Sequence, residues 1–376
     1  MSGTSADGVD AVACEIRGRG VRMSARVFAH VHRPYARALR GRLLAIMSPA
    51  ATRTESLARL DRDVGAAFAA AARAVLRRAR LNPRDVAVVG SHGQTVCHLP
   101  AEGCSLQIGR ADLIAAEIGC AVVSDFRSAD LAVGGQGAPL VPWTDWLLLR
   151  DARRSRAVLN VGGIANVTYL PAGVGPEGVR AFDTGPGNMV MDELARVLTR
   201  GRQAYDRGGR LAARGKPNAA LLRGWLAHPF FARRPPRSCG REEFGTGFVA
   251  SALRRRARMR RGDWLATALA LTVESIASAC QRFLPQRAGR AAIDEVIVCG
   301  GGSRNAALRT ALGRRFEPIP VRTIDDYNIP SAAKEALSFA LLACARVDGV
   351  PANLPRVTGA RRPVVLGRVT RLEPHP

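Results

Sequence analysis

The chain has 376 residues, of which 47% are hydrophobic and 23% charged; this composition suits a globular protein of two domains and excludes wholesale disorder. The formal charge of +25 is almost entirely due to arginine, because Lys216 and Lys334 are the only lysines. Apart from one dense run at 254–261 the arginines are spread along the chain, and aromatic residues make up only 5%, so we expect a solvated basic surface and no nucleic-acid partner.

The first part of the chain alternates predicted strands and helices. Residues 9–16 and 21–30 read as two strands joined by a Gly-Arg-Gly turn, which is typical of a hairpin. The apolar spacing over 35–80 predicts two helices with a break near 48–55. Short buried strands are expected at 86–90 and 120–126, and the Gly- and Pro-rich stretch 134–142 marks a boundary between two lobes.

The second part repeats this alternation. Two strands around a glycine turn are expected at 157–170, and a strand leading into a loop and helix at 179–188. Helices are expected at 218–231 and 262–283. A strand, a glycine turn and a helix follow at 294–316, and the final helix is expected at 331–347. The pattern predicts an α/β protein of two lobes, each a mixed sheet flanked by helices. We expect the N-terminal lobe to comprise 1–130 plus 345–376 and the C-terminal lobe 131–344.

Membrane, secretory and zinc-binding proteins are not indicated. The most apolar stretch, Trp264–Cys280, is too short to span a bilayer and contains Glu274, and the N-terminus lacks the layout of a signal peptide, so we expect a cytoplasmic protein. The eight cysteines form no Cys-x-x-Cys pair. His92, Cys97 and His98 lie close in sequence, but no second ligand cluster accompanies them.

Four glycine-rich turns follow predicted strands or open the chain, at 3–8, 162–165, 185–188 and 300–305. Such turns let backbone N–H groups approach phosphate oxygens, and strand ends are where α/β sheets bind ligands. The chain has no P-loop, no kinase-type glycine loop and no hydrolase nucleophile elbow. The turns therefore favour a nucleotide site of another kind.

Asp183 is the strongest candidate for catalysis, because it ends an apolar strand directly before Thr-Gly-Pro-Gly-Asn. A carboxylate at that place can accept a proton from a hydroxyl or water aligned with a γ-phosphate, or it can simply cap the following helix or hydrogen-bond the turn. Asp7 has the same two interpretations, as a magnesium partner through water or as a loop residue.

Several longer blocks then resemble one family. They are MSGTSADGVD, GSHGQTVCH, LQIG, DFRSADLAVGGQGAPLVP, NVGGIANVT, FDTGPGNMVMDE, GREEF, VCGGGSRN and NLPRVTGA. In this order, from Met1 to about Ala360, they are similar to anhydro-N-acetylmuramic acid kinases. The resemblance implies an actin/hexokinase-type fold of two RNase-H-like lobes with a central nucleotide cleft. It also implies that ATP and water convert 1,6-anhydro-N-acetylmuramic acid into N-acetylmuramic acid 6-phosphate, a step in recycling cell-wall sugars.

The same resemblance implies roles for particular residues, with ATP and Mg²⁺ as cofactors. Asp183 is the catalytic base, and Asp7 is the metal partner. The nucleotide phosphates are held by Gly3, Thr4, Ser5, Ala6, Asp7, Gly8, Val9, Asp10, Gly300 and Gly301. The candidates for gripping the sugar or lining the cleft are His92, Gln94, Asp125, Arg127, Gln136 and Glu335. Arg127 is expected either to pair bidentately with the lactyl carboxylate or to form an ion pair with Asp125 or Asp130.

Two departures from the family accompany the match. Members carry an apolar strand ahead of the MSGTS block, which stands at the start of this sequence. We therefore expect the first sheet to lack one strand, the phosphate loop to hang from a free end, and translation to begin upstream of Met1. Arg237 and Cys239 stand where the family commonly has Lys and Thr.

Other functions stay open at this point. A glycosidase-like enzyme would pair Asp183 with Asp192 and form no phosphate ester. A related kinase would act on another sugar. A non-catalytic actin-like ATP-binding or nucleic-acid-associated protein would bind ATP, or DNA with steep salt dependence, and leave the sugar unchanged. The expected partners are a small sugar and ATP, with no nucleic acid and no membrane, and a homodimer is compatible with the sequence.

Overall fold

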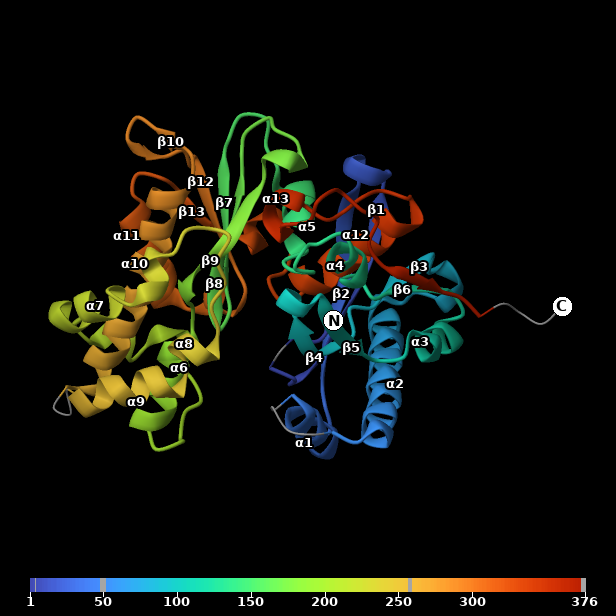
Figure 1. Ribbon diagram of the computed structural model, residues 1–376, viewed down its shortest axis with the longest axis horizontal. Coiled ribbons are helices and arrows are strands. Elements are labelled where there is room, and N and C mark those ends of the chain that lie inside the picture. The colour runs from blue at the N-terminus through green and yellow to red at the C-terminus, as the bar shows by residue number, and fades with distance from the viewer. Residues whose placement is uncertain (4, 48–51, 256–258, 373–376) are drawn as a thin grey trace. The chain divides into compact units, whose positions relative to one another are not determined.

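The computed structural model describes residues 1–3, 5–47, 52–255 and 259–372. The chain forms two compact units: unit 1 comprises Met1–Leu148 and Ala332–Pro376, and unit 2 comprises Leu149–Ser331. Strands and helices alternate in both units, which confirms the α/β class (Figure 1). The two units divide at 148/149 and 331/332, whereas the sequence suggested 130/131 and 344/345.

Helix α12 (Lys334–Val347) accounts for much of this difference. The sequence assigned it to the C-terminal lobe, but it packs on β1 (Gly8–Arg17) and β3 (Val88–Gly90) of unit 1. Its first residue forms a buried ion pair, with 2.7 Å between Lys334 Nζ and Asp145 Oδ1 on α5 (Val141–Leu149). A buried pair must keep its partner, so this contact fixes α12 to α5.

Unit 1 opens with the predicted hairpin. β1 pairs antiparallel with β2 (Ser24–Pro34), from Gly8 opposite Pro34 to Arg17 opposite Ser24. Two helices follow as expected, α1 (Arg37–Ile46) and α2 (Thr54–Ala79), although part of the predicted break lies outside the described residues. The amphipathic α2 buries Val64, Phe68 and neighbouring residues in the core of the unit, together with Val9 of β1 and Ile114 of α3 (Ala111–Ile118).

The remaining strands of unit 1 form two further small sheets. In one, β6 (Ala121–Ser124) pairs with β3 in parallel and with β14 (Arg368–Thr370) antiparallel. In the other, β4 (Gln94–Leu99) pairs with β5 (Cys104–Ile108). β4 and β5 were not predicted, because the polar residues and glycines of 94–108 show no clear alternation. The short helices α4 (Ser128–Ala132) and α13 (Pro355–Thr358) complete the unit.

Unit 2 is built on one five-stranded sheet with the order β13-β12-β7-β8-β9. Its strands are β7 (Arg156–Val161), β8 (Ile164–Leu170), β9 (Arg180–Pro186), β12 (Glu295–Cys299) and β13 (Val321–Thr323). β7, β8 and β9 run antiparallel to one another, whereas β12 is parallel to β7 and β13 is parallel to β12. This arrangement is the RNase-H-like order that the resemblance implied.

Helices cover the sheet of unit 2. They are α6 (Met189–Leu198), α7 (Ala219–Leu226), α8 (Arg241–Phe244), α9 (Thr246–Arg255), α10 (Arg261–Phe283) and α11 (Ala306–Phe316). α10 is mostly buried and packs on β8 and β9 within the main core. The helix predicted over 218–231 is shorter, because α7 ends at Leu226 and Pro229 opens a separate turn.

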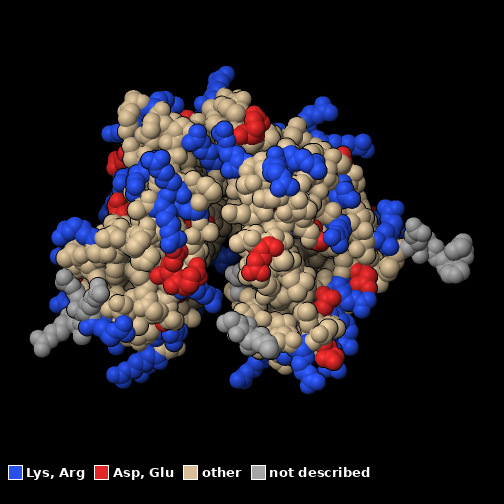
Figure 2. Space-filling view, viewed as in Figure 1, with Lys and Arg blue, Asp and Glu red and all other residues tan. Residues whose placement is uncertain are grey.

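Short elements connect these larger ones. The hairpin β10 (Gln286–Arg287) and β11 (Arg290–Ala291) follows α10. The 3-10 helices are Gly20–Arg22, Pro83–Asp85, Pro100–Glu102, Pro176–Gly178, Arg207–Gly209, Ala212–Arg214, Pro229–Ala232, Gly301–Arg304 and Ile324–Tyr327. Lys and Arg side chains are scattered over the visible face (Figure 2), and no helix in the described part of the chain is long and apolar enough to cross a membrane.

Candidate active site

Asp183 lies on β9 in unit 2 and is held by the segment that precedes α8. Its Oδ2 accepts a hydrogen bond of 3.0 Å from the backbone N–H of Cys239. Its backbone N–H donates to Arg237 O at 3.3 Å, and Arg237 Nε donates to Asp183 O at 2.8 Å. Oδ1 has no hydrogen-bond partner among the residues that the structure describes. One carboxylate oxygen is thus anchored while the other stays available.

The helix-capping interpretation of Asp183 does not hold. α6 begins after Asn188, whose side chain makes no capping bond, and Asp183 bonds to Cys239 instead. Burial raises the pKa of the Asp183 carboxyl to about 6, against the opposing effects of the Cys239 N–H and the charge of Arg237. A carboxylate that titrates near pH 6 is a better proton acceptor at neutral pH than an ordinary aspartate.

Arg237, one of the two departures from the family, is stacked among aromatic rings. Its guanidinium carbon lies 4.7 Å from the ring centroids of Phe230 and of Phe283. Nη1 donates to Arg233 O at 3.1 Å, and burial lowers the Arg237 pKa to about 10. The planar guanidinium makes contacts that a lysine ammonium would not reproduce. Arg237 therefore acts as a positioning residue for the strand end that carries Asp183.

The glycine turns of unit 2 bring strand ends close together. The N–H groups of Gly187 and Asn188 donate to Gly163 O at 2.8 Å and to Gly162 O at 2.7 Å. A Cβ on Gly187 would lie only 2.4 Å from Gly162 O. Gly300 has a φ of 76°, and a Cβ there would lie 2.5 Å from Asn160 Oδ1. Only glycine fits at these two positions.

A cavity of about 480 Å³ lies beside the last of these turns, entirely within unit 2. Gly301 borders it, together with Asp192, Tyr205, Arg207 and Arg304. Burial raises the pKa of Asp192 to about 7. The cavity thus combines an approachable backbone, two arginines and a carboxyl that can accept or donate a hydrogen bond, which suits a phosphorylated, hydroxyl-bearing ligand.

In unit 1 the loop that opens the chain is tightly anchored, contrary to the expectation of a hanging end. The Met1 amino group donates to Asp10 O at 2.9 Å, and Asp10 N donates to Met1 O at 2.8 Å. Ser2 Oγ lies 2.7 Å from Gly8 O and 2.6 Å from Gln94 Oε1. A Cβ on Gly8 would lie 2.4 Å from Arg33 O.

The residues within this loop differ in exposure. Thr4 lies outside the described residues. Ser5 and Asp7 are exposed, and Ser5 Oγ donates to Asp7 Oδ1 at 2.9 Å. Ala6 and Val9 are buried in the core, and Ala6 has a φ of 45°. Ser5 and Asp7 thus form the open part of the loop, and the two apolar residues fix it to the unit.

Asp10 faces two histidines on β2. Its Oδ1 lies 2.8 Å from His30 Nε2 and 3.2 Å from His32 Nδ1. Burial favours the neutral acid, but the hydrogen bond from His30 and the charges of both histidines outweigh it, so the pKa of Asp10 lies below its usual value. Asp10 is therefore an anion whose side chain points to the hairpin partner.

Gln94 supports the loop. It is fully buried, and its Nε2 donates to Gly3 O at 3.1 Å and to Thr95 O at 3.2 Å. Tyr35 OH donates to Gln94 Oε1 at 3.5 Å. The amide is thus engaged at both ends and positions the loop. Sequence reasoning missed Ser2 and Tyr35 in this network, because partners 92 and 59 residues apart leave no local signal.

His92 and Arg127 lie together in unit 1. Arg127 Nη2 lies 2.8 Å from His92 Nε2, Arg127 Nη1 donates to Gly137 O at 2.7 Å, and His92 Nδ1 lies 2.9 Å from Gly93 O. Burial lowers the pKa of His92 to about 3, so His92 is neutral and its Nε2 accepts from Arg127. Burial also lowers the pKa of Arg127, to about 10.

Arg127 does not form the alternative ion pair with Asp125 or Asp130 that the sequence allowed. Asp125 pairs with Arg368, with 3.0 Å between Oδ2 and Nε. Asp130 accepts from Gly137 N at 2.8 Å and from the side chains of Asn353 and Thr358. In the part of the chain that the structure describes, Arg127 has no carboxylate partner and its Nε is buried without a hydrogen bond. No carboxylate of the described residues therefore balances the charge of Arg127.

The last two expected sugar contacts are exposed. Gln136 directly precedes Gly137, whose carbonyl oxygen accepts from Arg127, and the Gln136 backbone N–H donates to Thr358 O at 2.8 Å. Glu335 lies in the first turn of α12, where its charge acts on the Met1 amino group. The structure therefore gathers His92, Arg127 and Gln136 in one part of unit 1, and Glu335 with Asp10 and Met1 in another.

Comparison with known proteins identifies the family. The sequence model of anhydro-N-acetylmuramic acid kinase matches residues 1–371. A curated anhydro-N-acetylmuramic acid kinase of Gloeobacter violaceus is 45% identical over 373 residues, which are 98% of this chain and 97% of that protein.

The chain belongs to the anhydro-N-acetylmuramic acid kinase family. Proteins of the same name from Salinibacter ruber and Caldanaerobacter subterraneus are 43% and 38% identical, over 98% of this chain and 94% and 95% of their own lengths. Members of this kinase family use ATP. The resemblance of the sequence blocks is thereby confirmed.

Proposed function

We propose that this anhydro-N-acetylmuramic acid kinase hydrolyses the 1,6-anhydro bridge of its sugar and transfers the γ-phosphoryl group of ATP to O6, in the cytoplasmic recycling of cell-wall sugars. One observation carries the proposal: Asp183 has a pKa of about 6, one oxygen anchored by Cys239 N–H and the other without a partner among the described residues. This is the arrangement that a general base for water requires.

The reaction balances with one base. Asp183 takes a proton from water as the water oxygen bonds to the anomeric carbon. The bond between that carbon and O6 breaks, and O6 forms a bond to the γ-phosphorus. The bond between this phosphorus and the bridging oxygen of ATP breaks, so ADP leaves, and Asp183 returns its proton to solvent. The products are N-acetylmuramic acid 6-phosphate and ADP.

For the nucleotide, we propose that the cavity of unit 2 takes the nucleoside part. Asp192 accepts hydrogen bonds from ribose hydroxyls, and the turn at Gly300 and Gly301 allows the close approach of the phosphates. In unit 1 we assign the loop from Gly3 to Asp10 to phosphate binding, because Ser5 and Asp7 are exposed on it. Asp7, exposed and bonded to Ser5, would hold Mg²⁺ through water, and this ion supplies positive charge to the phosphates.

For the sugar, we propose that Arg127 binds the lactyl carboxylate. It is a partly buried cation without a carboxylate partner among the described residues, and His92 and Gly137 O hold its guanidinium in place. Two N–H groups of an arginine match the two oxygens of a carboxylate. His92 is thus a positioning residue, and Gln136 lies beside the same cluster.

The test is product analysis with the purified full chain, ATP, Mg²⁺ and 1,6-anhydro-N-acetylmuramic acid in ¹⁸O-labelled water. The expected product is the 6-phosphate with one ¹⁸O at the anomeric carbon. An arm without ATP detects glycosidase chemistry, and an arm with N-acetylglucosamine detects a kinase for another sugar. ATP binding without any phosphorylated sugar, or a product without anomeric label, would contradict the proposal.

A further inference from the structure

Glu243 is a second carboxylate near Asp183, and the reaction proposed above does not use it. It lies on α8, which begins two residues after Cys239, the residue whose N–H binds Asp183 Oδ2. The first turn of α8 folds back on the chain, because Glu243 N donates to Gly240 O at 3.3 Å. This turn keeps Glu243 next to the segment that holds Asp183.

Aromatic rings fix α8 against the strand that carries Asp183. Phe244, the last residue of α8, is fully buried, and its ring centroid lies 5.5 Å from that of Phe231. Phe231 in turn lies against β9, since a Cβ on Gly185 would lie 2.8 Å from Phe231 Cε1. Such packing leaves the backbone of Glu243 little freedom to move away from β9.

The two carboxylate oxygens of Glu243 have different surroundings. Oε1 lies 2.7 Å from Arg233 Nη1. Oε2 is buried and has no hydrogen-bond partner among the described residues. The side chain of Glu243 is 15% exposed and that of Arg233 is 53% exposed, so solvent screens the arginine more than the carboxylate. The ion pair is therefore not balanced, and the buried oxygen keeps negative charge that no described donor offsets.

The charged groups near Asp183 come from several elements. Burial raises the pKa of the Asp183 carboxyl most; the charge of Glu243 adds to this effect, and the charge of Arg237 opposes it. Arg282, in the last turn of α10, acts on Arg237. Arg233 directly follows the 3-10 helix Pro229–Ala232 and bonds to Glu243. Glu243 is thus the anion among these groups that opposes the charge of Asp183.

The thiol of Cys239 responds to the same two carboxylates. Burial raises its pKa most, and the charges of Asp183 and Glu243 raise it further. The thiol therefore stays neutral at physiological pH and does not compete with Asp183 for a proton.

We propose that Glu243 is a positioning residue for the reaction, because its charge makes Asp183 a stronger base and its pair with Arg233 limits this effect. The inference rests on the proposed function of Asp183. When Asp183 takes the proton from water, its own charge disappears and the repulsion between the two carboxylates is relieved. The repulsion thus favours the transfer of the proton from water to Asp183.

The experiment compares Glu243→Gln with Arg233→Gln in the full chain. Glutamine keeps the size of Glu243 but removes its charge, so the acid side of the kcat/KM profile should move from about pH 6 to lower pH, by about half a pH unit. Loss of Arg233 leaves the charge of Glu243 unopposed, so the acid side should move to higher pH by a similar amount. Movement in the same direction in both variants, or in neither, would overturn the inference.

A double variant tests whether Arg233 acts through Glu243. In the Glu243→Gln background, Arg233→Gln should produce no further movement of the acid side of the profile. The full upward movement in that background would show that Arg233 acts on Asp183 directly, and it would contradict the role given to the pair.

A readout without turnover separates this inference from the proposed reaction. The ¹³C resonance of the Asp183 carboxyl, assigned by its loss in Asp183→Asn, titrates whether or not sugar is phosphorylated. Its midpoint should move down in Glu243→Gln and up in Arg233→Gln. Unchanged midpoints would overturn the inference even in an active enzyme, whereas the expected movements in an inactive protein would support it and contradict the reaction. If Glu243→Gln does not fold, the direction of the movement in Arg233→Gln still decides.

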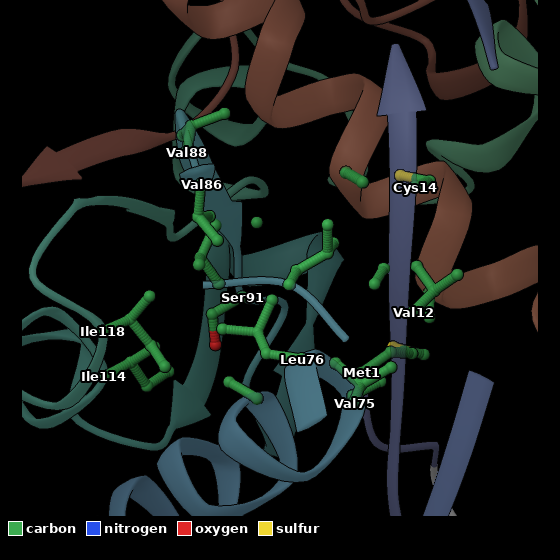
Figure 3. A pocket seen from close by; sticks show the side chains of 18 of the residues that line it. Met1, Val12, Cys14, Val75, Leu76, Val86, Val88, Ser91, Ile114 and Ile118 are labelled. Carbon is green, nitrogen blue, oxygen red and sulfur yellow. The ribbon is translucent and has the colours of Figure 1, made fainter. Parts of the chain in front are cut away.

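A control in unit 1 separates the effect of charge from a loss of stability. An apolar cavity of about 360 Å³ in that unit is lined by Val12, Val86, Ile114 and Ile118 (Figure 3). Ile118→Ala removes buried apolar contacts, so it should lower the midpoint of thermal unfolding and leave the acid side of the profile in place. A movement of the acid side in this control as large as in Glu243→Gln would show that the profile reports stability, and it would overturn the inference.

Discussion

Units 1 and 2 both combine antiparallel and parallel strands, but these strands form one sheet in unit 2 and separate sheets in unit 1. In unit 2 the strand β7 joins an antiparallel meander to two parallel strands, and its glycine turn is fixed by hydrogen bonds from Gly187 and Asn188. In unit 1 the hairpin β1–β2 and the sheet β3–β6–β14 are separate, and the glycine loop is held by Ser2 and Gln94. Backbone hydrogen bonds anchor the glycine turn of unit 2, whereas in unit 1 the buried side chains of Ser2 and Gln94 add to the backbone bonds between Met1 and Asp10.

The two units also differ in the chemistry that they offer. Unit 2 carries carboxyls with raised pKa values, Asp183 and Asp192. Unit 1 also has such a carboxyl, Glu335, but in addition carries Arg127, a cation with a lowered pKa. If unit 2 supplies the base and unit 1 the grip on the substrate's anionic group, substitutions in the two units should affect different kinetic constants.

The largest effect is expected for Asp183→Asn. The amide cannot accept the proton from water, so kcat should fall about 10²–10⁴-fold while the affinity for ATP stays unchanged. Steady-state kinetics with ATP and anhydro-sugar measure both. Glu193→Gln, which changes a carboxylate paired with Arg196 on α6, is the matched control and should keep most of the activity.

The dependence of kcat/KM on pH is a second test of Asp183 as the base. Because Asp183 must be ionised to act as a base and has a pKa of about 6, kcat/KM should fall as the pH drops below about 6. Activity that stays constant between pH 7 and pH 5 would show that another group takes the proton.

The next effect is expected in unit 1. Arg127→Lys removes the forked geometry but keeps the charge, so KM for the anhydro-sugar should rise about 10–100-fold with little change in kcat. Arg368→Lys, an exposed arginine that pairs with Asp125, is the control. A fall in kcat with unchanged KM would instead assign Arg127 to the reacting atoms.

A smaller effect, on the free energy of unfolding, should distinguish the glycine turn at Gly187 from the loop at Gly3. Gly187→Ala would place a Cβ 2.4 Å from Gly162 O, so it should lower the free energy of unfolding by about 1–3 kcal/mol. In Gly3→Ala the new Cβ would lie near Ser5 Oγ only, at 3.9 Å, so the free energy of unfolding should change by less than about 0.5 kcal/mol. Urea unfolding of the two variants measures the difference, and equal losses would mean that both turns are equally constrained.

The smallest effects are on stability against pH, and the two units should respond with opposite signs. The folded-state pKa of Asp183 is raised from 3.8 to about 6, so its contribution to stability is present below pH 4 and is lost as the pH rises through 6. The folded-state pKa of the Met1 amino group is lowered from 8.0 to about 6. The contribution of this group to stability is therefore present above pH 8 and is lost as the pH falls through 6. Each amounts to about 1 kcal/mol once solvent screening is considered.

Variants isolate the two contributions. Asp183→Asn should remove the dependence between pH 4 and 6, and N-terminal acetylation the dependence between pH 6 and 8, in urea titrations at fixed salt. An unchanged pH profile in either protein would show that the corresponding group keeps its ordinary pKa in the folded state.

Local patterns predicted much of this molecule. The hairpin β1–β2, the helices α10 and α12 and the position of Asp183 at a strand end follow from apolar spacing and turn residues over short windows. The resemblance added the family. These features depend on neighbours in the sequence, which is why they could be found there.

The features that sequence reasoning missed depend on long-range contacts. The unit to which α12 belongs is set by its packing on β3 and by the buried Lys334–Asp145 pair. The contact of Ser2 with Gln94 and the stacking of Arg237 on Phe283 join residues far apart in the chain. No local periodicity encodes these partners, so only the folded structure shows that Gln94 and Arg237 are positioning residues.

The hydrogen bond from Cys239 to Asp183 has one more consequence. The segment 237–239 that donates it belongs to neither the strand of Asp183 nor a long helix, and Arg237, stacked on Phe230 and Phe283, holds it in place. Drawing the segment away would strengthen the base, and pressing it closer would weaken it. Burial sets the basicity of this carboxyl in the first place, and the hydrogen bond from Cys239 adjusts it.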